Sequence, residues 1–390
     1  MRKTLLAASI CSLALAPAIA SADIHDTRAF ARGGAGMTMG GYHHALANPA
    51  LLARATESDW FSLGLNVGVL ASDKDGLIEN IDDADEGIEA LENKDGDVTA
   101  EEVNAILELT NNKLAQIDVG GALLVAIPNQ LAPMAFVAKT RASIGLEFFY
   151  DGDDLGILQD IENDVPGTSG DDLESQVAAS GAFVSEYGLM AGHRLNDELS
   201  LGATLKAQRI DLYAYQASVS NFEADEIEDS DFNRSHSSVN IDLGATYRMG
   251  DFTFAGTVEN LIPQSFTGPA FTDPAAGTVG TTDYKMNPVI TAGAGFGNGW
   301  IKTEANLDLT ARKGFDLLGD NQFFRLGAEI AAGRHAQLRA GFRTDMKSNV
   351  ADIVTVGFGL SPWGKASLDI TAAVGDGDTV GVGVQLGMRI

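Results

Sequence analysis

Apolar and polar residues alternate along most of this chain. In residues 58–71 (SDWFSLGLNVGVLA), Phe61, Leu63 and Leu65 begin a run in which every second residue is apolar, and the residues between them are small or polar. Successive side chains of a β-strand point to opposite faces, so this pattern predicts a strand with one apolar face and one small or polar face. The pattern recurs along the chain and predicts fourteen strands, at 59–71, 117–127, 132–150, 176–193, 197–220, 235–249, 251–262, 284–298, 300–312, 322–333, 335–345, 351–361, 364–375 and 378–390.

The connections between the predicted strands alternate between long and short. Long connections follow strands one, three, five and seven, and tight turns follow the even-numbered strands. The tight turns lie near Pro128, Asn196, Gly250, Gly299, Gly333 and Pro362. A chain that crosses a membrane repeatedly as a closed barrel has short periplasmic turns and longer outer loops. The sequence therefore predicts an all-β fold, a 14-stranded antiparallel transmembrane β-barrel over residues 58–390, in the bacterial outer membrane.

Aromatic residues collect near both predicted edges of the barrel, as two interfacial girdles require. The tight-turn ends of the strands hold Trp60, Tyr247, Phe252, Trp300 and Trp363. The opposite ends hold Phe148, Phe149, Tyr150, Tyr213, Tyr215, Tyr284, Phe323 and Phe324. A soluble sandwich or solenoid, the alternative all-β fold, gives no reason for this sorting.

Residues 1–22 have the features of a secretory signal peptide. Arg2 and Lys3 precede a short apolar run, and Ala20-Ser21-Ala22 matches an A-x-A cleavage site. We therefore expect Sec-dependent export and a mature chain that begins near Asp23. The one cysteine, Cys11, lies in this leader, so the mature chain is expected to have no disulfide, thiol catalysis or cysteine metal site.

The chain is strongly acidic, with 54 Asp and Glu against 26 Lys and Arg and a net charge of −28. Such a surface repels nucleic acid, so no nucleic-acid partner is expected. Three predicted outer loops, at 72–116, 151–174 and 221–234, together carry 29 of the 54 acidic residues. Two compatible interpretations are a solvated surface and a cation-bridged contact with outer-membrane lipid and lipopolysaccharide.

The first of these loops, residues 72–116, has helical periodicity. Its apolar residues recur at a spacing of three or four on both sides of a central break, which predicts a helical hairpin. At the start of the second helix, Thr99-Ala-Glu-Glu102 matches a capping box. A shorter helix is predicted near residues 155–161 of the second loop.

The break between the two predicted helices partly matches a calcium-binding loop. Asn93, Asp95, Asp97 and Glu102 fall on ligand positions, but Leu91 occupies the first of them. We favour an acidic turn with a well-capped helix and keep a weak Ca²⁺ site as the alternative. No other cofactor is expected.

The histidines do not form a catalytic or metal-binding group in the sequence. There are six, scattered along the chain, without a Ser/His/Asp grouping around them. Two adjacent residues, His43 and His44, cannot both aim at one ion from a regular element. We therefore predict that the protein is not an enzyme.

The segment before the first strand, residues 23–57, carries the most recognisable motifs. A glycine-rich stretch, Arg32-Gly33-Gly34-Ala35-Gly36-Met37, precedes Asn48-Pro49-Ala50-Leu51-Leu52. Later motifs are the strand end 258–263 (VENLIP) and the pair 325–329 (RLGAE) and 338–343 (LRAGFR). In this order, the motifs resemble those of the FadL-type outer-membrane transport superfamily. Within it they are most similar to the TraF-like conjugal transfer proteins, with PorV-type secretion barrels as further relatives.

The resemblance implies that residues 23–57 form a hatch that plugs the barrel. Small hydrophobic molecules would then pass through the hatch and an opening in the barrel wall. The chain departs from the usual barrel pattern at Ile390, where a terminal aromatic residue is expected. The name TraF is shared with a thioredoxin-like factor, but the lack of a Cys-x-x-Cys motif rejects that redox role. The residues assigned to the hatch are Gly33, Gly34, Gly36, Asn48, Pro49 and Ala50.

Two functions are open at this point. The first is passive transport of small hydrophobic molecules through the plugged barrel. The second is a structural role in conjugal transfer or secretion, in which the acidic outer loops bind envelope protein partners. The helical hairpin in the first loop favours the second function, because a simple pore does not need one.

Overall fold

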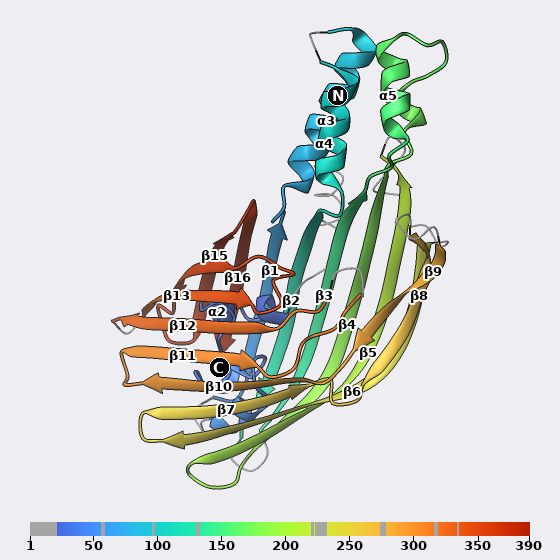
Figure 1. The fold of residues 1–390 in the computed structure, drawn as a ribbon. Coiled ribbons are helices and arrows are strands. Elements are labelled where there is room, and N and C mark those ends of the chain that lie inside the picture. The colour runs from blue at the N-terminus through green and yellow to red at the C-terminus, as the bar shows by residue number, and fades with distance from the viewer. Residues whose placement is uncertain are drawn as a thin grey trace.

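The computed structural model describes residues 22–55, 59–95, 98–129, 133–219, 222, 232–273, 278–315, 319–333 and 335–390. Within these residues, fourteen strands close into one antiparallel barrel (Figure 1). Its strands are β1 (Ser62–Ser72), β2 (Leu114–Ile127), β3 (Met134–Phe149), β4 (Gln176–Arg194), β5 (Leu199–Ser218), β6 (Asn233–Met249), β7 (Phe252–Glu259), β10 (Val289–Gly297), β11 (Ile301–Asp308), β12 (Phe323–Ala332), β13 (Ala336–Asp345), β14 (Ile353–Leu360), β15 (Ala366–Gly375) and β16 (Thr379–Arg389). The predicted all-β barrel is confirmed, and each predicted strand is represented in order. The predicted leader lies almost entirely outside the described residues.

β1 closes the barrel because it pairs with strands from both ends of the sheet. Ser62–Ala71 pair in antiparallel register with Arg389–Val380 of β16 on one side. The same residues pair with Ala126–Ile117 of β2 on the other side. Closure gives the main-chain N–H and C=O groups of the edge strands partners within the protein, which a bilayer, having no water in its core, requires.

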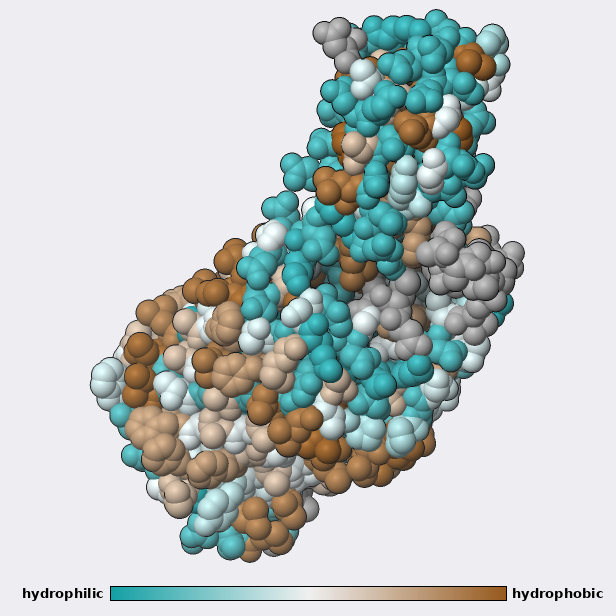
Figure 2. Space-filling model, viewed as in Figure 1, coloured by the Kyte–Doolittle hydropathy of each residue, from teal (hydrophilic) through white to brown (hydrophobic). Residues whose placement is uncertain are grey.

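The barrel has strands of two lengths. β2 to β6 contain 14 to 20 residues, whereas β1, β7 and β10 to β16 contain 8 to 11. The longer strands therefore rise beyond the others on one side of the molecule (Figure 1). On β5, outward-facing residues change from apolar Leu201 and Leu205 to Arg209, whose side chain is 64% exposed. In Figure 2 the lower part of the visible face is largely apolar and the upper part largely hydrophilic. We infer that the long strands leave the bilayer near Arg209.

Three helices pack together above the outer ends of the long strands, and we call them the outer helical cluster (Figure 1). They are α3 (Leu77–Asn93), α4 (Ala100–Thr110) and α5 (Asp154–Glu162), found where the sequence predicts a helical hairpin and a short helix. Their apolar faces share a buried core with Phe148 and Val177 of the strands beneath. Thr99 and Glu102 form the predicted capping box. None of the helices in the described part of the chain is both long and apolar enough to span a membrane.

A second hairpin lies outside the barrel ladder and was not predicted. It consists of β8 (Gln264–Asp273) and β9 (Thr278–Met286), in a region expected to be a long outer connection. Its residues cover apolar side chains of β4 and β5, in a cluster of Ala182, Val184, Ile210, Leu212, Phe266, Tyr284, Met286 and Phe315. The strand predicted at 284–298 is therefore two strands, because the chain breaks at Pro288, which has no N–H to donate to a ladder.

Only one of the two predicted aromatic girdles faces the bilayer. Trp60, Trp300 and Trp363 at the tight-turn ends are 84%, 64% and 80% exposed. The residues at the opposite ends are buried, namely Phe148, Phe149, Tyr215, Tyr284 and Phe323. The prediction of a second interfacial girdle is therefore wrong for these residues. The physical reason is that these ends lie under the outer helices or turn inward. The Phe323 ring lies beneath two guanidinium groups, 4.9 Å from the Cζ of Arg325 and 4.6 Å from that of Arg343.

Candidate functional site in the barrel lumen

Residues 22–55, which we call the lumen segment, lie inside the barrel. The segment contains short helical turns, η1 (Ala22–His25), α2 (Thr27–Phe30), η2 (Tyr42–His44) and η3 (Pro49–Arg54). Polar side chains start two of these turns: the Asp26 carboxylate accepts hydrogen bonds from the N–H groups of Arg28 and Ala29, and Asn48 Oδ1 accepts one from Ala50 N–H. Most of the segment is buried, and it contacts strands on opposite sides of the barrel.

Glycines of the wall allow the lumen segment to approach the barrel main chain. Gly192, Gly202 and Gly244 pair in one row across β4, β5 and β6. A Cβ at Gly192 would lie 2.6 Å from the N atom of Ala53, and a Cβ at Gly202 would overlap with the main chain of Pro49. We call this row the glycine seat. It explains why the inner face of these strands has small residues at these positions.

The six residues assigned to the hatch lie in two places along the wall. Gly33 approaches β13, where a Cβ on it would be 2.7 Å from the carbonyl carbon of Phe342. Gly33 and Gly34 have φ values of 66° and 86°, a region that glycine adopts without strain. Gly36 packs on Ala29, since an added Cβ would lie 2.8 Å from the Ala29 Cβ.

Asn48, Pro49 and Ala50 lie on the glycine seat, on the other side of the lumen segment. Asn48 Nδ2 donates to Met37 O at 3.1 Å and to Ala245 O at 3.3 Å. The asparagine therefore ties the glycine-rich stretch to the seat and to β6. The sequence motifs identified the glycine-rich stretch and the Asn-Pro-Ala segment. The tertiary structure places the two on different parts of the wall.

Buried ion pairs hold the glycine-rich part of the lumen segment. Arg28 Nε lies 2.7 Å from Asp369 Oδ2 of β15. Arg32 Nη1 lies 3.1 Å from Glu329 Oε2 of β12. Thr38 N–H also donates to Glu304 Oε1 of β11 at 3.0 Å. Sequence analysis named Glu329 only as the end of the motif 325–329 (RLGAE) and assigned none of these three wall residues to the lumen.

Two histidines of the lumen segment are held in the neutral form. Burial lowers the pKa of His44 to about 4, with the nearby Arg28 guanidinium acting in the same direction and Asp26 opposing it. Burial likewise lowers the pKa of His25 to about 4, and Lys139 adds to this effect. His44 Nε2 lies 3.0 Å from Arg28 Nη1. Because guanidinium is only a donor, His44 Nε2 must be the acceptor, which agrees with a neutral ring.

A polar cavity of about 90 Å³ lies between the lumen segment and the hairpin of β8 and β9. It is lined by Lys139, Glu186, Lys206, Glu259 and Arg312, with His25 and Asp26 from the lumen segment. Lys206 Nζ lies 2.9 Å from both Glu186 Oε1 and Asp242 Oδ1. Apolar contacts come from Val184, Tyr284 and Met286 at one side. The cavity can hold several water molecules and is not an apolar binding pocket.

A shallow apolar groove of about 560 Å³ lies on the wall formed by β7 and β10 to β13. Its lining includes Phe252, Phe296, Leu326, Ala328 and Phe342. The main-chain pairing of β10 with β11, β11 with β12 and β12 with β13 continues through this region. The wall is thin here, because Gly327 and Gly341 of the same lining contact Arg32 of the lumen segment on the inner side.

The Ca²⁺ site that the sequence offered as an alternative, in the loop between α3 and α4, stays a prediction. Of the four candidate ligands, Asp97 lies outside the described residues. Glu102 Oε2 already accepts from the N–H and the hydroxyl of Thr99, at 3.0 Å and 3.1 Å. Asn93 Nδ2 donates to Glu89 O, at the end of α3. The geometry of Glu102 therefore supports the capping role that we favoured from the sequence.

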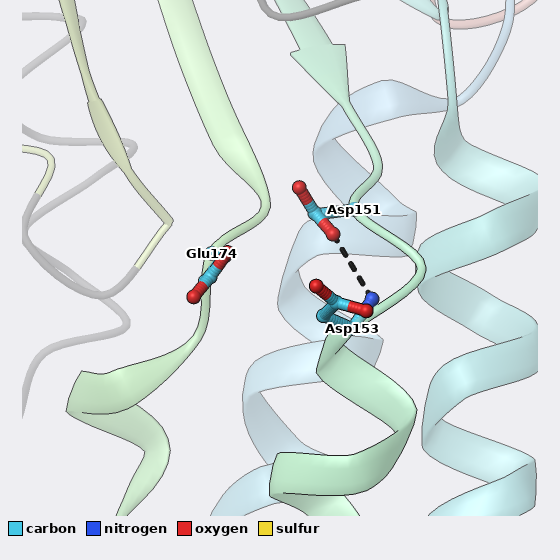
Figure 3. Close-up of side chains that lie close together, drawn as sticks. All are labelled: Asp151, Asp153 and Glu174. Atoms are coloured by element: carbon cyan, nitrogen blue, oxygen red, sulfur yellow. Dashed lines mark hydrogen bonds between the residues drawn. The ribbon is translucent and has the colours of Figure 1, made fainter.

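Three other carboxylates approach one another beside α5. Oxygen atoms of Asp151, Asp153 and Glu174 lie within 4.8 Å of each other (Figure 3). Asp153 and Glu174 are exposed, and Asp153 N–H donates to Asp151 Oδ1 at 2.9 Å. These contacts describe a solvated acidic turn.

The fold and its lumen define a class of protein. A closed antiparallel barrel with an apolar outer band, filled by its own amino-terminal segment, is the fold of transmembrane β-barrels with a plugged lumen, and a FadL homologue shares it. The chain belongs to the family described as "F plasmid transfer operon, TraF, protein", whose model matches residues 45–308. No curated protein matches the chain.

Solved structures of hydrocarbon channels have a similar fold. The toluene transporter TodX of P. putida matches with a TM-score of 0.54 and 13% identity, over 95% of this chain and 99% of that one. The CymD monoaromatic hydrocarbon channel matches with a TM-score of 0.53 and 13% identity, over 95% and 96%. A Pseudomonas aeruginosa FadL homologue matches with a TM-score of 0.52 and 11% identity, over 93% and 97%. At these identities the matches show a shared fold.

Proposed function

We propose that the protein is a passive channel for small hydrophobic molecules and that the lumen segment is its hatch. The supporting observation is how the segment is held inside the barrel. Its anchors are ion pairs, hydrogen bonds and contacts with glycines, all with the wall of a separately closed sheet. Such a segment can move without breaking the barrel ladder. A hatch of this kind gives the channel a closed state and an open state.

The chemistry of the lumen limits how a hydrophobic molecule would travel. In the closed state, the cavity beside His25 is lined by charged groups that are already paired, such as Lys206 with Glu186 and Asp242. An apolar molecule would displace water from these groups without replacing their hydrogen bonds. We therefore expect no stable hydrophobic ligand in this cavity, and passage only when the hatch moves.

The groove on β10 to β13 supports an exit toward the bilayer. It combines an apolar outer surface with a wall of small residues, behind which Arg32 of the hatch lies directly. Movement of this part of the hatch would remove the inner support of the wall at Gly327 and Gly341. A hydrophobic molecule leaving there would enter the bilayer without crossing the periplasm.

The test compares entry of a lipophilic dye, 1-N-phenylnaphthylamine, into cells that produce the intact chain or a chain lacking residues 23–57. The lipopolysaccharide leaflet slows spontaneous entry of such a dye, so channel-dependent uptake is measurable. We expect faster entry through the deleted form and little entry without the protein. If the chain lacking residues 23–57 is as abundant as the intact chain and dye enters at the same rate through both, the hatch-gated channel is contradicted.

A second function, support of conjugal transfer or secretion, is favoured by the outer helical cluster. α3, α4 and α5 have their own buried core, with Leu107 and Leu158 fully enclosed, and an acidic exterior. Replacement of residues 77–110 by a short Gly/Ser linker tests this function. A scaffold requires the cluster for conjugation or partner capture, whereas a channel retains dye uptake without it.

A further inference from the structure

Two arginines of the lumen segment meet two carboxylates that belong to neighbouring parts of the wall. Arg28 pairs with Asp369 at 2.7 Å and Arg32 with Glu329 at 3.1 Å. Arg28 Nη2 also donates to Ser367 Oγ at 2.7 Å. The four charged side chains are at most 9% exposed, so solvent screens these pairs little.

Arg339 of β13 joins the two pairs into one network. Its Nε lies 2.7 Å from Glu329 Oε2, and its Nη1 lies 2.7 Å from Asp369 Oδ1. Glu329 and Arg339 are direct partners across β12 and β13. To reach Asp369 of β15, the Arg339 side chain must pass over β14. Gly359 of β14 permits this, because a Cβ there would lie 2.8 Å from Arg339 Nη1.

The charges of the wall remain balanced when the lumen segment leaves. Lys302 Nζ lies 2.5 Å from Glu329 Oε1, so the wall supplies two cations, Lys302 and Arg339, for two carboxylates. A broken buried ion pair is normally unfavourable because one charge is left without a partner. Here Glu329 and Asp369 keep their wall partners after Arg28 and Arg32 withdraw. The contact can therefore open and close reversibly.

We propose that Arg28, Arg32, Glu329, Arg339 and Asp369 form a latch that keeps the channel closed. Opening separates the two hatch arginines from the wall, while residues 48–54 stay on the glycine seat. Arg28 and Arg32 are thus positioning residues that set the equilibrium between closed and open hatch. This inference rests on the proposed function, in which the lumen segment gates the barrel.

The first test is single-channel recording of the purified full-length mature protein in planar bilayers. We expect a mostly closed wild-type channel and openings about tenfold or more frequent in the double variant Arg28→Gln/Arg32→Gln, since its hatch loses both charged contacts. Arg209→Gln is the matched control, because Arg209 pairs with Asp211 on the exposed outer part of β5. Its opening frequency should equal that of the wild type.

A reversible tether distinguishes hatch movement from a damaged barrel. A Cβ at Gly68 would lie 3.3 Å from Ile24 Cβ, close to the spacing of a disulfide. Ile24→Cys/Gly68→Cys is added to the double arginine variant, in a mature chain with no other cysteine. Oxidation should suppress the openings and dithiothreitol should restore them. Openings that persist after oxidation would mean a leak through the barrel and would overturn the latch.

The outcomes separate the latch from the proposed function. If the chain lacking residues 23–57 conducts but the double arginine variant opens no more often than Arg209→Gln, the gate stands and the latch is refuted. If the deleted chain does not conduct, the gated channel itself fails.

Discussion

The two halves of the lumen segment are held by different forces. The amino-terminal half, around Arg28 and Arg32, is bound to β12 and β15 by buried ion pairs. The carboxy-terminal half, residues 48–54, rests on the glycine seat by close steric fit. Ion pairs respond to changes in charge, whereas steric fit responds to changes in volume. On the proposed function, we therefore expect the ion-paired half to be the movable part of the hatch and the sterically fitted half to be its hinge.

The largest expected effect comes from Glu329→Gln. This change leaves Arg32, Lys302 and Arg339 around a neutral amide in a buried site, which should destabilise the folded barrel by about 3–5 kcal/mol. The measurement is the temperature at which the barrel loses its heat-modifiable mobility on gels. An unchanged midpoint would show that the network contributes little, and the distinction between the two halves would then fail.

Acidification should open the amino-terminal half selectively. His25 and His44 have pKa values lowered to about 4 in the closed hatch, while a released, hydrated histidine has a pKa near 6.5. The open form therefore binds more protons between these values, so closure is fully favoured above pH 6.5 and weakens as pH falls toward 4. At pH 5 the free energy that favours the closed hatch is smaller by about 2 kcal/mol for each histidine.

The measurement is opening frequency in planar bilayers between pH 7.5 and 5. Asp26, Arg28 and Arg32 are the charged groups that influence the pKa of His44, and Arg28 would face a second cation when the ring is protonated. His44→Gln should reduce the pH dependence. His335→Gln changes an exposed histidine whose ring is hydrogen-bonded to Ser361 O, and it should leave the pH dependence unchanged.

Adding volume to the seat should disturb the carboxy-terminal half. In Gly202→Ala the new methyl group would overlap with the Pro49 main chain, and overpacking of this kind destabilises by about 1–3 kcal/mol. Limited proteolysis near residues 48–54 reports the displacement. Gly64→Ala is the control, since its Cβ would lie 3.9 Å from Leu124 Cβ. Equal protease resistance of both variants would argue against a steric seat.

The smallest effect is expected at the link between the halves. Asn48→Ser keeps a neutral side-chain oxygen that can cap Ala50 N–H but loses the amide donor to Met37 O and Ala245 O. We expect a loss of about 1 kcal/mol and a modest rise in opening frequency. This variant retains the cap, whereas Asn48→Ala loses both the cap and the donor. Equal effects of the two changes would therefore show that Asn48 contributes through its donated hydrogen bonds and not through the cap.

Much of the fold could be predicted because the signal is local. The alternation of apolar and small residues indicated each strand, and the tight turns indicated the order in which the strands pair. The outer helices followed from their own periodicity and from the capping box at Thr99. The hairpin β8–β9 was missed because residues 264–286 fold back over apolar side chains of β4 and β5, which local pattern does not reveal.

The candidate site divides in the same way. The glycine-rich and Asn-Pro-Ala motifs pointed to the lumen segment, but not to the wall residues that hold it. Arg28 and Asp369 are 341 positions apart, and nothing in their spacing connects them. Phe323 looked like an interfacial aromatic from its position, yet it is buried beside Arg325 and Arg343.

The sequence by itself determined the strands, their order and the acidic outer helices, because these depend on periodicity, turns and caps among neighbours in the chain. Only the tertiary structure decided which glycines form the seat and which charges form the latch. Those choices depend on barrel closure, which brings β4 to β6 and β11 to β15 around one segment and buries the charges where water cannot screen them.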